Sequence, residues 1–288
     1  MENTWNYGRQ ELFRAEKLYT AQNYQTFLET FRKKFSDYVY YCPFRRKDVI
    51  SAPLNSIKNI FVPMDCLHQL TQLETKDDLQ RMTLDLIYLL SAESHISLKD
   101  FGLHGSVALG MHTSKSDMDL VVYGSHNFRM LEATIGQLVQ ADILSYRFSN
   151  RIDAARRYKG RYMNKVFMFN AIRKPEEIKQ KYGELQYTTV APVNLTCKVK
   201  DDNEAMFRPA IYEIEDCNPR DKFLSLPADM VPKTVVSMIG CYRNVASRGD
   251  MIRVSGMLER AENLQTGQVF HQVVVGTSTS EEERIWPL

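Results

Sequence analysis

The segment 101–124 constrains the fold most, because a glycine–serine pair precedes an acidic pair and an apolar run there. Ser106 follows Gly105 directly, Asp117 comes eleven residues after Ser106, and Asp119 lies two positions further on. The apolar residues around Asp119 predict a β-strand, on which residues i and i+2 point to the same side. We therefore expect both carboxylates on one face, with the neighbouring apolar side chains turned to the core.

This arrangement suits a phosphorylated ligand bound together with a metal ion. Gly105 lets the backbone approach a ligand closely because it has no side chain, and Ser106 offers a hydroxyl and an N–H group. Two carboxylates on one face suit Mg²⁺, which prefers oxygen ligands and usually shares its coordination with substrate phosphates. Phosphoryl and nucleotidyl transfer need in-line geometry and positive charge near the reacting oxygens, which two metal ions can supply.

The whole pattern, an apolar lead-in, Gly-Ser, a spacer and Ser-Asp-x-Asp before an apolar strand, resembles the signature of the DNA polymerase β superfamily of nucleotidyltransferases. With the β-rich C-terminal half, it also looks like an uncharacterised archaeal group of predicted nucleotidyltransferases. The resemblance implies that Gly105, Ser106 and Ser116 bind the incoming nucleotide. It also implies that Asp117 and Asp119 are catalytic and hold Mg²⁺ or Mn²⁺.

The superfamily usually has a third carboxylate on a later strand, and here the match fails. The two expected strands, 166–172 and 193–199, offer Asn170 and Asn194 as their nearest polar residues, and neither is charged. An asparagine in that position would leave metal binding through the acidic pair and slow the chemical step. If the strand bounds differ from those expected, the alternatives are Asp201, Asp202 and Glu176.

The resemblance implies an α/β (α+β) core in which a mixed sheet is flanked by helices. Apolar residues at three- and four-residue spacing predict helices over 10–35, 76–91 and 127–139, and a short helix over 175–182. Strands are expected over 118–123, 166–172, 193–199, 210–214, 234–239, 251–258 and 269–275. The last five, separated by turn-forming residues, predict a small barrel or sandwich, of which we expect a β-barrel-like domain.

These elements divide the chain into three expected parts. Residues 1–75 form an N-terminal helical or irregular region, residues 76–187 form the nucleotidyltransferase core, and residues 188–288 form the β-rich domain.

A basic segment lies between residues 151 and 181. It has ten basic and three acidic residues and a net charge of +7, against +2 for the whole chain. Two interpretations stay open: a solvated helix face, or a surface that faces phosphates.

Composition sets further limits on the class of protein. No apolar run is long enough to span a membrane, so we expect no membrane partner. The five cysteines are widely spaced and form no CxxC pair, which favours free buried thiols in a reducing cytoplasm. Three histidines near the acidic pair are expected to make structural hydrogen bonds rather than contacts with phosphate: His104, His112 and His126.

The leading hypothesis is a cytoplasmic transferase that moves NMP from an NTP, ATP included, to a hydroxyl and releases pyrophosphate. A nucleic-acid end, a protein side chain and a small molecule all remain open as the acceptor, and the basic segment leans towards nucleic acid. The competing hypothesis is a non-catalytic protein that uses the same fold to bind nucleotide or RNA. The sequence does not determine the oligomeric state.

Overall fold

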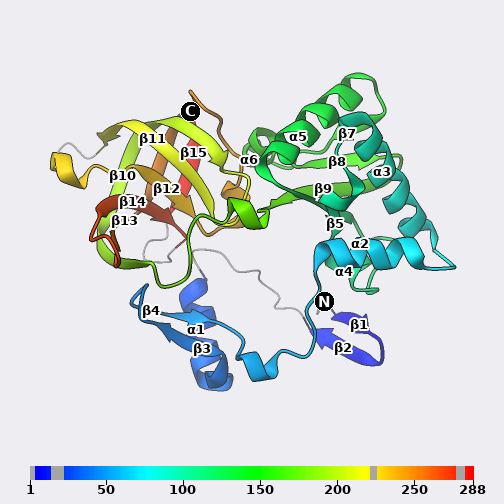
Figure 1. The fold of residues 1–288 in the computed structure, drawn as a ribbon, viewed down its shortest axis with the longest axis horizontal. Coiled ribbons are helices and arrows are strands. Elements are labelled where there is room, and N and C mark those ends of the chain that lie inside the picture. Colours follow the sequence, from blue (N-terminus) through cyan, green and yellow to red (C-terminus); the bar gives the residue numbers. More distant parts are fainter. Residues whose placement is uncertain (1–3, 14–22, 221–225, 277–282) are drawn as a thin grey trace. The chain divides into compact units, whose positions relative to one another are not determined.

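The computed structural model describes residues 4–13, 23–220, 226–276 and 283–288, and the chain divides into two compact units (Figure 1). The first unit comprises Met1–Leu18 and Asn59–Glu177, and the second comprises Tyr19–Lys58 and Ile178–Leu288. This division says which segments pack together and not which of them fold alone. The domain boundaries expected near residues 75 and 187 therefore stay predictions.

A five-stranded mixed sheet forms the centre of the first unit. Its spatial order is β5 (Phe101–Leu103), β6 (Met118–Tyr123), β9 (Lys165–Ile172), β8 (Lys159–Tyr162) and β7 (Leu144–Tyr146). The β6–β9 pair is parallel and the other pairs are antiparallel. A separate hairpin in this unit consists of β1 (Thr4–Tyr7) and β2 (Gln10–Phe13).

Helices flank this sheet, as the fold of the resembled family implies. They are α2 (Pro63–Gln72), α3 (Asp78–Ser94), α4 (Gly105–Ala108), α5 (Ser125–Gln140) and α6 (Arg151–Arg156). Figure 1 shows α5 running along the sheet, and α3 and α5 pack on each other and on β6. Phe128 of α5 lies against Phe169 of β9, with ring centroids 5.6 Å apart. Short 3₁₀ turns occupy Leu98–Asp100 and Pro175–Glu177.

Three of the expected elements are confirmed, and two expected helices differ from the structure. The expected strand 118–123 is β6, and the helices expected over 76–91 and 127–139 are α3 and α5. The helix expected over 10–35 is wrong at its start, because Gln10–Phe13 is β2, paired through a turn at Gly8, whose φ is +59°. Its C-terminal part is α1 (Tyr24–Lys34), and residues 14–22 lie outside the described residues. The helix expected over 175–182 is only the 3₁₀ turn.

The second unit contains a six-stranded sheet. Its spatial order is β10 (Leu185–Glu204), β11 (Ala210–Pro219), β12 (Thr234–Ser237), β14 (Val269–Val275), β13 (Met251–Asn263) and β15 (Arg284–Pro287). Because β10 also pairs with β13, the pairings among the first five strands close into a ring, while β15 pairs with β13 alone. All five strands expected after residue 190 are present. The expected description of this sheet as a small barrel stays a prediction.

The second unit also includes α1 and a hairpin of β3 (Val39–Cys42) and β4 (Lys47–Ile50). The hairpin turn is tied to the sheet, because Tyr187 N donates to Phe44 O at 2.8 Å and Arg45 stacks over the Tyr187 ring. Short 3₁₀ turns lie at Ser36–Tyr38, Leu54–Ser56, Ala228–Met230 and Gly240–Tyr242. Residues from before and after the first unit's sheet thus share one core.

Tyr212 offers a test of how this core is held. Its side chain is fully buried, and its hydroxyl donates to Tyr242 O at 2.7 Å and accepts from Val245 N at 2.9 Å. Tyr212→Phe would leave both backbone groups without this partner and should cost about 1–3 kcal/mol of unfolding free energy. Urea denaturation measures the loss. The exposed Tyr41 is the control, and Tyr41→Phe should change stability by less than about 0.5 kcal/mol. Equal stabilities for the two variants would contradict the bonding role of Tyr212.

Candidate functional site

The carboxylate of Asp119 packs directly against the backbone of Gly105. A Cβ atom built on Gly105 would collide with Asp119 Oδ2 and would lie 2.9 Å from Asp119 Cγ. Gly105 also has a φ of +68°, which side chains other than glycine's rarely adopt. Space and backbone conformation therefore both require glycine here, and the structure brings the glycine–serine pair and the acidic pair together.

Strand pairing produces this close approach. β5 runs antiparallel to β6, with Leu103 opposite Leu120, and His104 N donates to Asp119 O at 3.1 Å. The chain then turns at Gly105 into α4, which has only four residues. So short a helix adds little dipole, so any phosphate contact here depends on backbone N–H groups and on Ser106 itself. The Ser106 hydroxyl makes no hydrogen bond to the part of the chain that the structure describes.

The two faces of the sheet differ in character. Met118 and Leu120 are fully buried, while Asp119 between them is partly exposed. Phe167 and Phe169, on the neighbouring β9, are buried on the side that α5 covers. We call the opposite side, which carries Asp119, the carboxylate face. The alternation expected from the sequence therefore holds along β6.

The acidic pair is electrostatically strained. Burial, and after it the neighbouring charge of Asp117, raise the pKa of Asp119 to about 6, while Lys159 acts in the opposite direction. Two carboxylates near each other in a partly buried place favour a bound cation, because the cation relieves both the burial cost and the mutual repulsion.

Ser116 lies in the turn that leads into Asp117. Its hydroxyl accepts from Thr113 N at 3.0 Å, and its own N–H donates to Thr113 O at 3.0 Å. The Ser116 oxygen thus closes the turn. Its expected contact with nucleotide stays a prediction.

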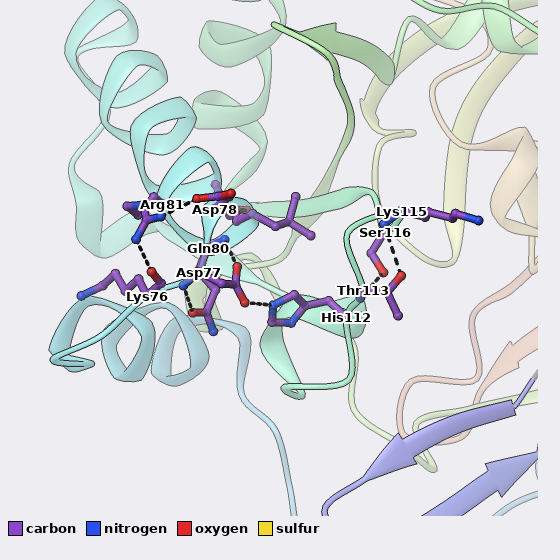
Figure 2. A network of polar contacts seen from close by, with 11 residues as sticks. Lys76, Asp77, Asp78, Gln80, Arg81, His112, Thr113, Lys115 and Ser116 are labelled. Atoms are coloured by element: carbon purple, nitrogen blue, oxygen red, sulfur yellow. Dashed lines mark hydrogen bonds and ion pairs between the residues drawn. The ribbon is translucent and has the colours of Figure 1, made fainter.

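The loop before Asp117 is fastened to α3 through a histidine (Figure 2). His112 Nε2 lies 2.7 Å from Asp77 Oδ2, and Asp77 is also the N-cap of α3 in a capping box with Gln80. Burial would raise the pKa of Asp77, but the hydrogen bonds from Gln80 N–H and His112 outweigh it and lower that pKa. On the other side of the loop, Lys165 Nζ donates to Ser114 O. The structural role expected of His112 is confirmed.

A cavity of about 690 Å³ lies beside this loop. It is bounded by the first turns of α3, by residues 112–114 of the loop and by residues 163–165 at the turn between β8 and β9. Its volume is typical of a ligand pocket. Neither Asp117 nor Asp119 lines it, so we do not place the triphosphate there.

The strand register places no carboxylate beside Asp119 on β9. Met168 of β9 stands beside Asp119, and Asn170 stands beside Val121, one step further along the same face. Asn170 Nδ2 lies 3.2 Å from His104 Nε2, so this asparagine is held by the residue before Gly105. Within the described ranges, no group of three or more His, Cys, Asp or Glu side chains could hold a metal ion.

The other candidates for the third ligand lie elsewhere in the fold. Asn194, Asp201 and Asp202 belong to β10, in the sheet of the second unit, and Glu176 lies exposed in the turn Pro175–Glu177. None of them is on the strand beside β6.

The basic segment is not a single helix face, so that interpretation is wrong. It runs through α6, β8 and β9. Arg156 is buried, with its guanidinium 3.5 Å from the centre of the Tyr158 ring. Lys159 and Arg161 alternate with the buried Gly160 along β8 and share the carboxylate face. The sequence did not predict that Lys159 lies on this face, because a strand of four residues is too short for its alternation of buried and exposed residues to be recognised.

Comparison with known proteins agrees with this geometry. Residues 89–190 match the family model described as a nucleotidyltransferase domain. This part of the chain is similar to that domain family. The matched range includes the glycine–serine pair, the acidic pair and the strands that hold them, and the domain supports a general nucleotidyl-transfer activity. The resemblance stated from the motif is thereby confirmed.

A second similarity extends beyond the nucleotidyltransferase domain over most of the chain. The chain is 26% identical over 267 residues to an uncharacterised protein of Methanocaldococcus jannaschii, covering 85% of this chain and 75% of that protein. This agrees with the archaeal group that the sequence resembles. No solved structure matches the chain. Among the described helices, none combines the length and the apolar composition that a membrane crossing needs.

The raised pKa of Asp119 predicts that its ionised carboxylate lowers the stability of the fold. Its value of about 6 in the folded chain exceeds the ordinary 3.8, so ionising this carboxyl costs folding free energy as pH rises from about 4 through 6. Without metal, Asp119→Asn should stabilise the chain at pH 7.5 by about 1–3 kcal/mol and have little effect at pH 4.

Urea denaturation at both pH values measures this difference. The exposed Asp142 is the control, because its Asn variant makes the same chemical change at the surface and should leave stability within about 0.5 kcal/mol. An equal effect of Asp119→Asn at both pH values would mean that the carboxylate is not the source.

Proposed function

We propose that the nucleotidyltransferase domain transfers NMP from an NTP to a hydroxyl acceptor and releases pyrophosphate. One observation carries this proposal: the Asp119 carboxylate lies against Gly105 and beside Asp117, within the matched domain. In the reaction the acceptor oxygen bonds to the α-phosphorus, the bond from that phosphorus to the pyrophosphate oxygen breaks, and the hydroxyl proton passes to solvent.

The side chains at this site fit a hard divalent cation. Asp117 and Asp119 offer carboxylate oxygens, and burial together with the Asp117 charge raises the pKa of Asp119. Mg²⁺ commonly takes its other ligands from phosphates and water. A bound Mg²⁺ or Mn²⁺ would supply positive charge to the triphosphate. Gly105 allows the backbone to approach that triphosphate, and the Ser106 hydroxyl is available to donate to a phosphate oxygen.

The acceptor is proposed to carry phosphate, and a nucleic-acid end fits this requirement. Arg161 of β8 stands opposite Ser145 of β7. Arg147 directly follows β7, and its N–H continues the pairing by donating to Lys159 O at 3.0 Å, so both arginines share the carboxylate face. Both are exposed. Positive side chains beside a nucleotidyl-transfer site favour a polyanion through counterion release.

A non-catalytic nucleotide- or RNA-binding protein remains the second candidate. The observation that favours it is Met168 beside Asp119, where a carboxylate would help to deprotonate the acceptor. General-base help is commonly worth about 10²–10⁴-fold in rate. Metal-dependent release of pyrophosphate from labelled NTP separates the two candidates, since only the enzyme produces it.

The proposed location is the cytoplasm. All five cysteines are free, which supports a reducing compartment. Three of them are buried as expected, whereas Cys217 is partly exposed and Cys241 is exposed.

Substitution of either carboxylate should weaken the metal-dependent binding of nucleotide. Calorimetric titration with a non-hydrolysable ATP analogue and Mg²⁺ should show affinity weakened roughly 10–100-fold in Asp117→Asn and in Asp119→Asn. Pyrophosphate release should fall in parallel. Asp142→Asn is the matched control and should behave as the unaltered chain. Equal metal-dependent binding by all four proteins would remove the site assignment.

The two arginines on the carboxylate face should govern the salt dependence of acceptor binding. Single-stranded RNA should bind with an affinity that falls with salt, and Arg147→Ala with Arg161→Ala should reduce the slope of log K against log salt by roughly 1–1.5. Fluorescence anisotropy over a salt series measures this slope. Lys33→Ala with Lys34→Ala, exposed residues of α1, removes the same charge and should leave it unchanged. Identical slopes for the two double variants would exclude this face as the RNA site.

A further inference from the structure

Lys159 stands in one row with Asp119 across three strands. It is opposite Met168 in the antiparallel β8–β9 pair, and Met168 is beside Asp119 in the parallel β9–β6 pair. Residues paired in this way project from the same face of a sheet. Gly160 confirms the alternation, because a Cβ atom there would lie 2.6 Å from the ring of Phe167 on the opposite, helix-covered face.

The lysine is within electrostatic range of the acidic pair without touching it. Neighbouring strands lie about 4.8 Å apart, so roughly 10 Å separates the two backbone positions, and both side chains extend into that interval. Lys159 lowers the pKa of Asp119, but no ion pair joins them. Within the described residues its ammonium makes no hydrogen bond or ion pair with any side chain.

The residue between the two charges cannot hold a metal ion of the expected kind. Met168 offers a thioether, a soft ligand that Mg²⁺ does not take, in the position beside Asp119 where a third carboxylate would otherwise contribute. A second divalent cation at this place would therefore gain no additional carboxylate and would be repelled by the neighbouring ammonium. The row supplies one anionic site and one fixed positive charge.

We infer that Lys159 replaces the second metal ion of this site. One divalent cation binds Asp117 and Asp119, and the Lys159 ammonium contacts a non-bridging oxygen of the α-phosphate. This inference rests on the proposed function and makes Lys159 a catalytic residue of it. While the acceptor oxygen bonds to the α-phosphorus and the pyrophosphate oxygen leaves, the ammonium keeps its proton and stabilises the charge on the α-phosphate oxygens.

Removal of the lysine charge should move two affinities in opposite directions. In Lys159→Met, Mn²⁺ alone should bind roughly tenfold more tightly, since a repelling charge is gone. A non-hydrolysable ATP analogue with Mn²⁺ should bind roughly tenfold more weakly, since a phosphate contact is gone. Lys159→Arg keeps the charge and should retain most of the analogue affinity. The unaltered chain should bind one Mn²⁺ in the presence of the analogue.

Arg157→Met is the matched control. It removes a positive charge two residues away, but Arg157 is exposed and lies near Tyr146, whose hydroxyl faces Gly136 of α5 on the helix-covered side. Both affinities should stay within about twofold, because screening weakens exposed charges at longer range. Calorimetry with Mn²⁺ and with the analogue gives both affinities and the metal count.

Each other result has a distinct meaning. Two Mn²⁺ ions per unaltered chain, or a Lys159→Met protein that binds both probes as the unaltered chain does, would overturn the inference and leave the proposed function intact. Loss of both affinities in Lys159→Met would show a merely structural lysine and also overturn it. Failure of the unaltered chain to bind either probe would overturn the proposed function and the inference together.

Discussion

The packing of Gly105 against the Asp119 carboxylate is the contact on which the rest of the site depends. It requires β5 and β6 to pair in their observed register, so that the chain can turn directly over the acidic strand. Asp119 is partly buried there, and this burial, together with the charge of Asp117, raises its pKa to about 6. The strand pairing therefore brings a backbone suited to phosphate next to a carboxylate. The same pairing places that carboxylate where its ionised form is unfavourable, and a bound cation would relieve this cost.

A second set of contacts fixes the loop between these two parts. His112 joins it to the N-cap of α3 through Asp77, and Lys165 joins it to β9 through Ser114 O. Asp77 thus serves two purposes, because one carboxylate caps a seventeen-residue helix and anchors the approach to Asp117. The position of Asp117 is consequently set by two elements that are distant from it in sequence.

The carboxylate face orders its charges along one direction of the sheet. Asp119 on β6, the apolar Met168 on β9 and Lys159 on β8 follow one another at strand spacing. A triphosphate that reaches from the carboxylates toward β8 would meet a metal-binding site first and fixed positive charges next. This arrangement links the proposed chemistry to the proposed acceptor, since Arg161 of β8 and Arg147, directly after β7, extend the positive charge outward.

The sequence by itself determined the acidic strand, the long helices α3 and α5, the C-terminal strands and the glycine–serine pair, because periodicity and motif spacing are local properties of the chain. Only the tertiary structure decided that Met168, rather than Asn170, stands beside Asp119, and that Lys159 joins their row. It also decided that His112 meets Asp77, thirty-five residues away, and that residues 19–58 pack with residues 178–288. Strand register and long-range contacts decide these points, and a one-residue change of register moves every side chain of a strand to the other face without altering the local pattern from which the strand was predicted.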